Sequence, residues 1–375
     1  MINNEIYPWN QQAWEQFCAQ SNGAALPHAF LLTGPSGIGK KALAAAMAKS
    51  LLCENRQANG AACGHCVSCH WFEAGHHPDL RLIRPAIVAA QEGNADEPGE
   101  GDEGGSSAPA PESTGSDKKL SKEITIAQIR ALGDFCAMTA VRNGVRIAMI
   151  YPAESMNNSA ANALLKVLEE PGEQFHFFLI TDAPHRLLPT IRSRCRTWPI
   201  KAPDRHAALE WLSQHNLDRP EYKLAALGGS PLRLLELEPT AYWDTLDLLL
   251  TALSEPARLD APALAKQLEN AIKLNEKERQ SGAAHSLDLP LILGWLQRWT
   301  LDVLYCQSGV PIRYHPQRQT AIERATVTVH STAWLNYWHW LNRAVREAHH
   351  PVNMALFLED CLLRYPALNL AHKGR

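Results

Sequence analysis

Apolar residues in the first half of the chain follow two alternating patterns. Short, nearly continuous apolar runs predict buried strands at residues 29–33, 145–150 and 175–181, with a further strand near 196–200. Between them, apolar residues at helical spacing predict helices at residues 11–20, 41–52, 126–135 and 159–170, the last ending before Pro171. Strands that alternate with helices are typical of an α/β domain in which helices cover both faces of a parallel sheet.

The strand pattern ends near residue 203, and the rest of the chain is predicted to be helical. Residues 204–238 form a small helical unit that contains the turn GGSP. Residues 239–375 are expected to form a helical bundle, because apolar residues recur at three and four spacings over 243–253, 291–305, 334–345 and 354–363. The tryptophans of this bundle are interpreted as core residues rather than as a platform for stacking nucleic-acid bases.

A glycine-rich segment, GPSGIGKK at residues 34–41, follows the first predicted strand and opens the next helix. It fits the phosphate-loop pattern G-x-x-x-x-G-K-[ST] except at the last position, which is Lys41. Glycines let successive backbone N–H groups point at a phosphate, and the lysine of the motif reaches the terminal phosphates. We therefore predict a degenerate nucleotide loop made by Gly34, Gly37, Gly39, Lys40 and Lys41, with a chance glycine-rich turn as the alternative.

Two groups that would hold magnesium are missing from this pattern. Lys41 replaces the hydroxyl, and the strand at 145–150 runs into Tyr151-Pro152 where an ATPase needs an acid facing the loop. Glu154 lies two residues beyond Pro152, and we expect it on the wrong side of a turn. The sequence therefore predicts negligible ATP hydrolysis by this chain alone, while nucleotide binding without turnover stays open.

Four cysteines, Cys53, Cys63, Cys66 and Cys69, cluster directly after the predicted helix at residues 41–52. Two-residue spacings let thiolates converge on one tetrahedral ion, so we predict a structural zinc site within a module at about residues 53–80. An iron–sulfur cluster is the rival, and four nearby histidines are substitutes if one thiol is not a ligand: His65, His70, His76 and His77. Four thiolates would fill the coordination shell and leave no position for catalysis.

Charge is distributed unevenly along the 375 residues, whose net charge is −3. Residues 91–117 hold eight acids and no Lys or Arg, so the remainder carries +5. That segment is rich in Gly and poor in large apolar residues, and we predict a disordered insert at about residues 88–121. A tolerated insertion is favoured over an acidic lure for a basic partner. The sequence shows no export signal and no apolar run near 18 residues, so we expect a cytoplasmic protein without membrane contact.

Arg194, in the sequence Ser193-Arg194-Cys195, is a candidate for action on another subunit. It follows the apolar strand at 175–181 and the segment LLPTIRSRC. A guanidinium aimed at a transferring phosphoryl group of a neighbour raises its rate by roughly 10³- to 10⁵-fold. An ordinary surface ion pair is the alternative for any single Arg, and the surrounding pattern favours the functional interpretation.

Taken together, the chain resembles the AAA+ clamp-loader family over nearly its whole length. The marks of the resemblance are PHAFLLTGPSGIGKK, the four-cysteine module followed by GHHPDL, NNSAANALLKVLEEP, LLPTIRSRC, and GGSPLR at residues 228–233. The strand that would carry the magnesium-binding acid resembles the corresponding strand of the family member that does not hydrolyse ATP. The ATPase members would show Asp-Glu where Tyr151-Pro152 stands.

The resemblance implies an AAA+ domain at residues 1–203 with its inserted zinc module, a helical lid at 204–238 and an all-α collar at 239–375. It further implies a stator in a hetero-pentamer with ATPase subunits and a delta subunit, which loads a sliding clamp onto primed DNA. Arg194 would complete the ATP site of the adjacent ATPase subunit, and Arg233 matches the family's sensor arginine. The acidic insert is a departure from the family pattern.

Three rival functions remain open at this stage. A catalytic ATPase subunit of the same loader would need the missing magnesium ligands. A P-loop kinase would explain GPSGIGK but neither Ser193-Arg194-Cys195, GGSPLR nor the long helical tail. A zinc-stabilised DNA-binding module is weakly supported, because the body of the chain carries a charge of only +5.

Overall fold

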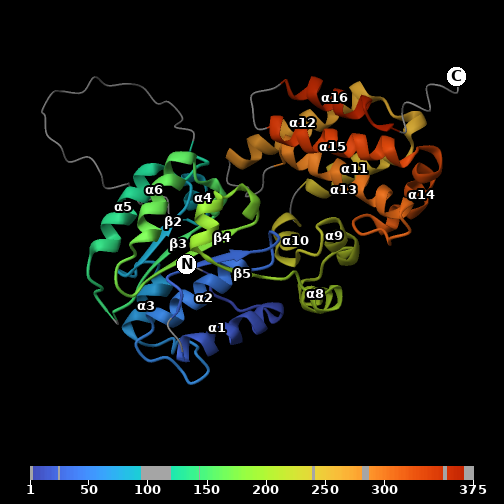
Figure 1. Cartoon of the computed structure of the whole chain (residues 1–375). Coiled ribbons are helices and arrows are strands. Elements are labelled where there is room, and N and C mark those ends of the chain that lie inside the picture. Colours follow the sequence, from blue (N-terminus) through green and yellow to red (C-terminus); the bar gives the residue numbers. More distant parts are fainter. Residues whose placement is uncertain are drawn as a thin grey trace, which may run out of the picture. The chain divides into compact units, whose positions relative to one another are not determined.

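The computed structural model describes residues 3–23, 26–93, 120–142, 144–238, 241–280, 287–348 and 353–366. The chain divides into two compact units, Met1–Pro203 and Asp204–Arg375 (Figure 1). No helix among the described residues combines the length and apolar content needed to cross a lipid bilayer.

The first unit is built on a five-stranded parallel sheet in the order β2-β3-β4-β1-β5. Its strands are β1 Ala29–Thr33, β2 Leu80–Ile83, β3 Arg146–Ile150, β4 Phe175–Thr181 and β5 Arg196–Pro199. The predictions of β1, β3, β4 and β5 are confirmed to within a residue or so at their ends. The sequence does not predict β2, because this run is four residues long and Arg81 interrupts it.

Helices cover both faces of the sheet. Side chains of successive strand residues point to opposite sides, so strands that are apolar throughout present two apolar faces that need cover. Phe30 and Leu32 of β1 belong to one apolar core, and Ala29 and Leu31 belong to the other. The first face is covered by α1 Gln11–Gly23, α2 Lys40–Leu52 and α3 Val67–Ala74, with α4 Ala86–Gln91 beside them; the second is covered by α5 Ile126–Ala137, α6 Asn158–Glu169 and α7 Pro189–Arg194 (Figure 1). The predicted α/β class is therefore confirmed.

The predicted limits of the disordered insert are wrong at their N-terminal side. Residues 86–91 form helix α4, and Glu92 at its C-terminal end makes several side-chain contacts. The apolar residues Ile87 and Val88 give this segment a face that packs, and Val88 lies against the first apolar core. Residues 94–119, on which the rest of that prediction falls, lie outside the described residues.

The second unit is helical throughout its described part, as predicted. Its helices are α8 Arg205–Leu212, α9 Pro220–Ala226, α10 Pro231–Leu237, α11 Tyr242–Ser254, α12 Ala261–Gln280, α13 Leu289–Gln307, α14 Gln319–Thr328, α15 Ser331–Glu347 and α16 Met354–Leu363. One apolar core runs from α8 to α16, so the segments expected as lid and collar share it. Trp295, Trp299 and Trp334 are fully buried in this core, which confirms the interpretation of these tryptophans as packing residues.

Candidate functional site

The phosphate loop begins at the carboxyl end of β1, between the ends of two neighbouring strands. Thr33 lies opposite Thr181 of β4 and Pro199 of β5, so Gly34 enters the loop beside both of those strand ends. A Cβ atom at Gly34 would lie 2.3 Å from the carbonyl oxygen of Ile200, which only glycine avoids. Ligands of open parallel sheets bind at this edge, so the fold places the loop where a phosphate would be held.

Lys40, the lysine of the loop, is turned onto the protein itself. Its side chain is only 4% exposed, and its Nζ lies 2.5 Å from Oδ1 of Asp182. The same Nζ donates to the carbonyl oxygens of Gly34, at 2.8 Å, and of Pro35. A buried ammonium needs such acceptors, because an unpaired buried charge is strongly unfavourable. In this conformation the donors of Lys40 are engaged within the loop and by the end of β4.

Lys41 and Tyr151, the two replacements for magnesium ligands, do lie together. The Nζ of Lys41 is 5.2 Å from the centroid of the Tyr151 ring. Both contact the carboxylate of Glu92, with Lys41 Nζ 2.6 Å from Oε1 and the Tyr151 hydroxyl donating to Oε2 at 2.8 Å. The position that would need two oxygen ligands for a divalent cation therefore contains an ammonium and a phenol.

The expectation for Glu154 requires correction. It lies in the short 3-10 turn Ala153–Ser155, and its Oε1 accepts the backbone N–H of Asp182 at 3.2 Å. The turn after β3 thus brings the Glu154 carboxylate to the end of β4, beside the residue that pairs with Lys40. Asp182 was not among the candidate residues of the sequence. It directly follows a predicted strand, but only the strand order shows that this strand neighbours β1.

Arg194 is partly exposed and is the last residue of α7. The buried residues near it in sequence anchor this helix to the core. Ile191 and Cys195 are buried in the core, and burial raises the pKa of the Cys195 thiol to about 12. The Arg194 side chain is 36% exposed and forms an ion pair with Glu169, itself 50% exposed. Its Nη1 also donates to the carbonyl oxygen of Thr190 at 3.1 Å. The end of α7 thus carries a partly exposed guanidinium whose contacts are an ion pair with an exposed glutamate and a backbone carbonyl one turn back.

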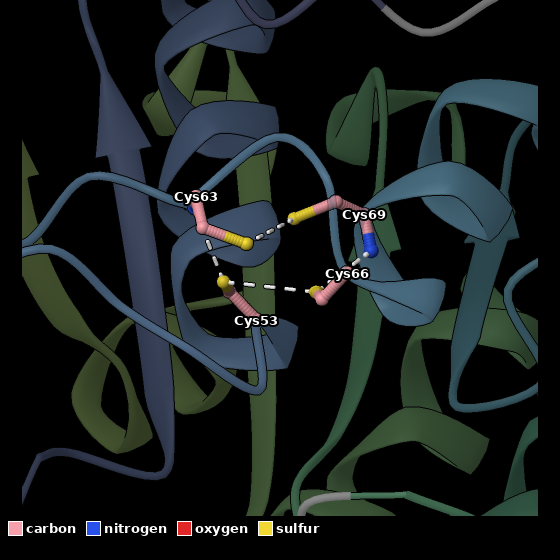
Figure 2. Close-up of side chains that lie close together, drawn as sticks. All are labelled: Cys53, Cys63, Cys66 and Cys69. Carbon is pink, nitrogen blue, oxygen red and sulfur yellow. Dashed lines mark hydrogen bonds between the residues drawn. The ribbon is translucent and has the colours of Figure 1, made fainter.

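The four cysteines converge on one point, as the sequence predicts. Their sulfur atoms all lie within 4.8 Å of one another (Figure 2). Cys53 Sγ is 3.9 Å from Cys66 Sγ, and Cys63 Sγ is 4.0 Å from Cys69 Sγ. Four thiolates around zinc, with Zn–S distances of about 2.3 Å, are separated by about 3.8 Å along each tetrahedral edge. The donor set and its spacing therefore fit one tetrahedral metal ion.

Backbone donors also support the sulfur atoms. The N–H of Cys63 donates to Cys53 Sγ at 3.2 Å, and that of Cys69 donates to Cys66 Sγ at 3.4 Å at the start of α3. The pKa of the Cys63 thiol is lowered to about 7, chiefly by the backbone N–H of His65, whereas burial raises the pKa of Cys53 and Cys69. The backbone N–H groups thus favour a negatively charged sulfur at Cys63, whereas burial disfavours the charge at Cys53 and Cys69, where a bound cation would offset it.

Histidines are not required as substitute ligands among the described residues. His77 is buried, its Nε2 lies 2.6 Å from Ser68 Oγ, and its Nδ1 accepts the Asp79 N–H. His65 Nδ1 lies 2.8 Å from the Cys63 carbonyl oxygen, while His70 and His76 are exposed. The Ser68 hydroxyl donates to the Leu52 carbonyl, so this hydrogen-bonded group ties the cysteine module to the end of α2.

Arg233, the remaining candidate, lies in α10 of the second unit. Its Nη1 is 3.1 Å from Glu236 Oε2, one turn along the same helix. Contact between Arg233 and the phosphate loop, which lies in the first unit, stays a prediction.

A parallel sheet with a phosphate loop after β1, followed by a helical unit, places the chain in the class of α/β P-loop proteins. A family model described as DNA polymerase III, delta subunit, matches residues 9–204. The DNA polymerase III subunit delta' of Pseudomonas aeruginosa is 35% identical over 307 residues, which cover 81% of this chain and 78% of that protein. The chain belongs to the family of DNA polymerase III delta-prime subunits.

Two further relatives place the chain within this group. The subunit delta' of Yersinia pestis is 31% identical over 312 residues, covering 81% of this chain and 77% of that protein. The DNA polymerase III subunit tau of Escherichia coli is 29% identical over 189 residues, covering 50% of this chain and 24% of that protein. The likeness to these two delta-prime proteins is therefore longer than the likeness to this tau subunit.

Proposed function

We propose that this chain is a non-hydrolysing stator of the clamp loader that supplies Arg194 in trans to the ATP site of an adjacent ATPase subunit. The complex would contain ATPase subunits and a delta subunit in a hetero-pentamer, and it would load the sliding clamp onto primed DNA. Residues 204–238 would act as the lid and residues 239–375 as the collar that holds the ring together.

The proposal rests mainly on which side chains occupy the place where an ATPase would bind magnesium. An ammonium at Lys41 and a phenol at Tyr151 meet there around Glu92, although hydrolysis needs a metal ion that bridges the phosphates. The Lys40 ammonium, which would reach the terminal phosphates, pairs instead with Asp182. A chain with this loop is poorly suited to turn over ATP.

The contacts of Arg194 support its action on a neighbour. Exposed ion pairs contribute about 0–1 kcal/mol, so the guanidinium can leave Glu169 at little cost. Buried Ile191 and Cys195 anchor the backbone on either side of Arg194. This anchoring reduces the range of positions that the guanidinium can adopt. A guanidinium presents several fixed donors to phosphoryl oxygens, which lysine does not.

The same proposal assigns structural zinc to Cys53, Cys63, Cys66 and Cys69. Zinc bound by four thiolates supplies folding free energy and no chemistry, because its coordination shell is complete. The cysteines would hold the loop between α2 and α3 in place. They contribute nothing to phosphoryl transfer in this account.

The test is ATP turnover by the reconstituted clamp loader containing Arg194→Ala. The single ATP site that borders this chain should lose roughly 10³-fold or more of its rate, measured by single-turnover phosphate release on primed DNA. Arg192→Ala is the matched control, because Arg192 lies on the same short helix and its side chain is exposed. Assembly should be unchanged in both complexes. Normal turnover by an assembled Arg194→Ala complex would refute the trans-acting role.

A further inference from the structure

Three donors from three separate elements converge on one carboxylate beside the phosphate loop. Lys41 comes from the first turn of α2, Arg84 directly follows β2, and Tyr151 directly follows β3. The Lys41 ammonium and the Tyr151 hydroxyl hydrogen-bond to Glu92 at 2.6 and 2.8 Å. Arg84 Nε lies 3.2 Å from Glu92 Oε2, an ion-pair distance at which this buried N–H makes no hydrogen bond with any described residue. Because β2 and β3 are neighbours, Arg84 and Tyr151 are brought together by the sheet itself.

The burial of these groups shows that the donors are part of the fold. Arg84 is 5% exposed and Tyr151 is 6% exposed, whereas Lys41 and Glu92 are 39% and 24% exposed. Burial, followed by the negative charge of Glu92, raises the pKa of the Tyr151 phenol, so it stays protonated and donates. Arg84 and Tyr151 therefore form the buried side of the site, whereas Lys41 and Glu92 are partly exposed to solvent.

The charges of the cluster do not cancel. Lys41 and Arg84 contribute two positive charges, and Glu92 contributes one negative charge. Across the described ranges, from 3–23 to 353–366, no second carboxylate forms an ion pair with Lys41 or Arg84. An arginine that is this deeply buried needs an anionic partner, so removal of Glu92 would leave an unoccupied site for an anion.

The chemistry of the cluster also selects the kind of anion. Magnesium requires oxygen ligands in octahedral geometry, and here two cations would repel it. Phosphate oxygens, in contrast, accept hydrogen bonds from ammonium, guanidinium and hydroxyl groups. A phosphate group without a bound divalent cation fits this site better than a magnesium-chelated one.

We propose that Lys41, Arg84 and Tyr151 form an anion site, occupied in the resting chain by Glu92, that accepts a metal-free phosphate group when Glu92 leaves. This inference goes beyond the proposed function, because it concerns neither Arg194 nor the neighbouring subunit. Glu92 acts as an internal competitor of the phosphate. The dependence on magnesium is the reverse of that of an ordinary phosphate loop, since the cation withdraws the ligand from the site.

The experiment is calorimetric titration of the full chain with tripolyphosphate, in the presence of a chelator and then with excess magnesium. Glu92→Ala should bind the metal-free probe about tenfold more tightly than the unsubstituted chain, and magnesium should weaken that binding. Glu92→Gln, which removes the charge but keeps an acceptor for Tyr151, should change affinity in the same direction by less. It serves as the second variant if Glu92→Ala folds poorly.

Two controls separate the site from general attraction of anions. Glu123→Ala removes an exposed acid elsewhere in the same unit and should leave affinity unchanged. Adding Lys41→Ser to Glu92→Ala should abolish the gain. The proposal is wrong if Glu92→Ala binds no more tightly than Glu123→Ala, if the gain survives Lys41→Ser, or if magnesium strengthens binding.

Discussion

Lys40 and Arg194 are both cations of the first unit that phosphate chemistry could use, and the protein holds them very differently. Lys40 is 4% exposed and bound to Asp182 and two loop carbonyls, whereas Arg194 is 36% exposed and rests on an exposed glutamate. If Lys40 lost its contact with Asp182, a buried ammonium would lack its anionic partner. If Arg194 left Glu169, a weak surface ion pair would be replaced by contacts with water. The difference indicates that the loop is satisfied internally and that Arg194 is available to a partner.

Lys41 extends the same contrast. It stands beside Lys40 in the loop, and its ammonium contacts the chain's own Glu92. The two adjacent lysines of the loop therefore both pair with carboxylates of this chain. Arg194 lies on α7, which we expect at the border with a neighbouring subunit.

The largest expected effect on stability concerns the cysteine module. Like Lys40, its four thiols have their partners within this chain. Cys66→Ser should abolish zinc binding and lower the free energy of unfolding of the first unit by on the order of 3 kcal/mol, because metal binding supplies folding energy. Zinc per chain is measured by atomic emission, and unfolding by urea titration with hydrogen exchange to assign the unit. Cys306→Ser, outside the cluster, is the control. Retention of full zinc by Cys66→Ser would contradict the assignment.

A smaller effect is expected from Asp182→Ala, which removes the carboxylate partner of Lys40. The free energy of unfolding should fall by about 1 kcal/mol, since Asp182 is 43% exposed and Lys40 keeps two carbonyl acceptors. Urea midpoints are compared with those of Asp134→Ala, an exposed acid on α5. If the two variants were equally stable, the pairing of Lys40 would not matter to the fold.

The smallest effect is expected from Glu169→Gln, which removes the exposed partner of Arg194. Stability should change by less than about 0.5 kcal/mol, because both side chains are exposed. ATP turnover of the reconstituted loader should stay at the level of the unsubstituted complex or rise slightly. A loss of turnover as large as that of Arg194→Ala would mean that the ion pair itself, and not a mobile guanidinium, is needed.

Much of this architecture could be predicted from local sequence, because it depends on short patterns. Apolar runs predict four of the five strands, and the spacing of the cysteines predicts their convergence. The absence of a hydroxyl at Lys41 and of an acid at Tyr151 is also visible in the sequence. Each of these features depends on residues that are close together in the sequence.

The carboxylates that fill the loop could not be predicted, because they are brought there by strand order. Asp182 reaches Lys40 since β4 neighbours β1, and Arg84 meets Tyr151 since β2 neighbours β3. Glu92 lies in a stretch whose composition is typical of disorder, yet its side chain has three partners. Sequence patterns fix the strands but not their order, and these contacts depend on the order.

The central claim is that this chain assists hydrolysis by a neighbour and performs none itself. The most direct test is ATP turnover, with magnesium, by the purified chain in the absence of any partner subunit. Phosphate release should not exceed the buffer background, and Lys40→Ala should leave that result unchanged. Magnesium-dependent release by the lone chain, abolished by Lys40→Ala, would contradict the account.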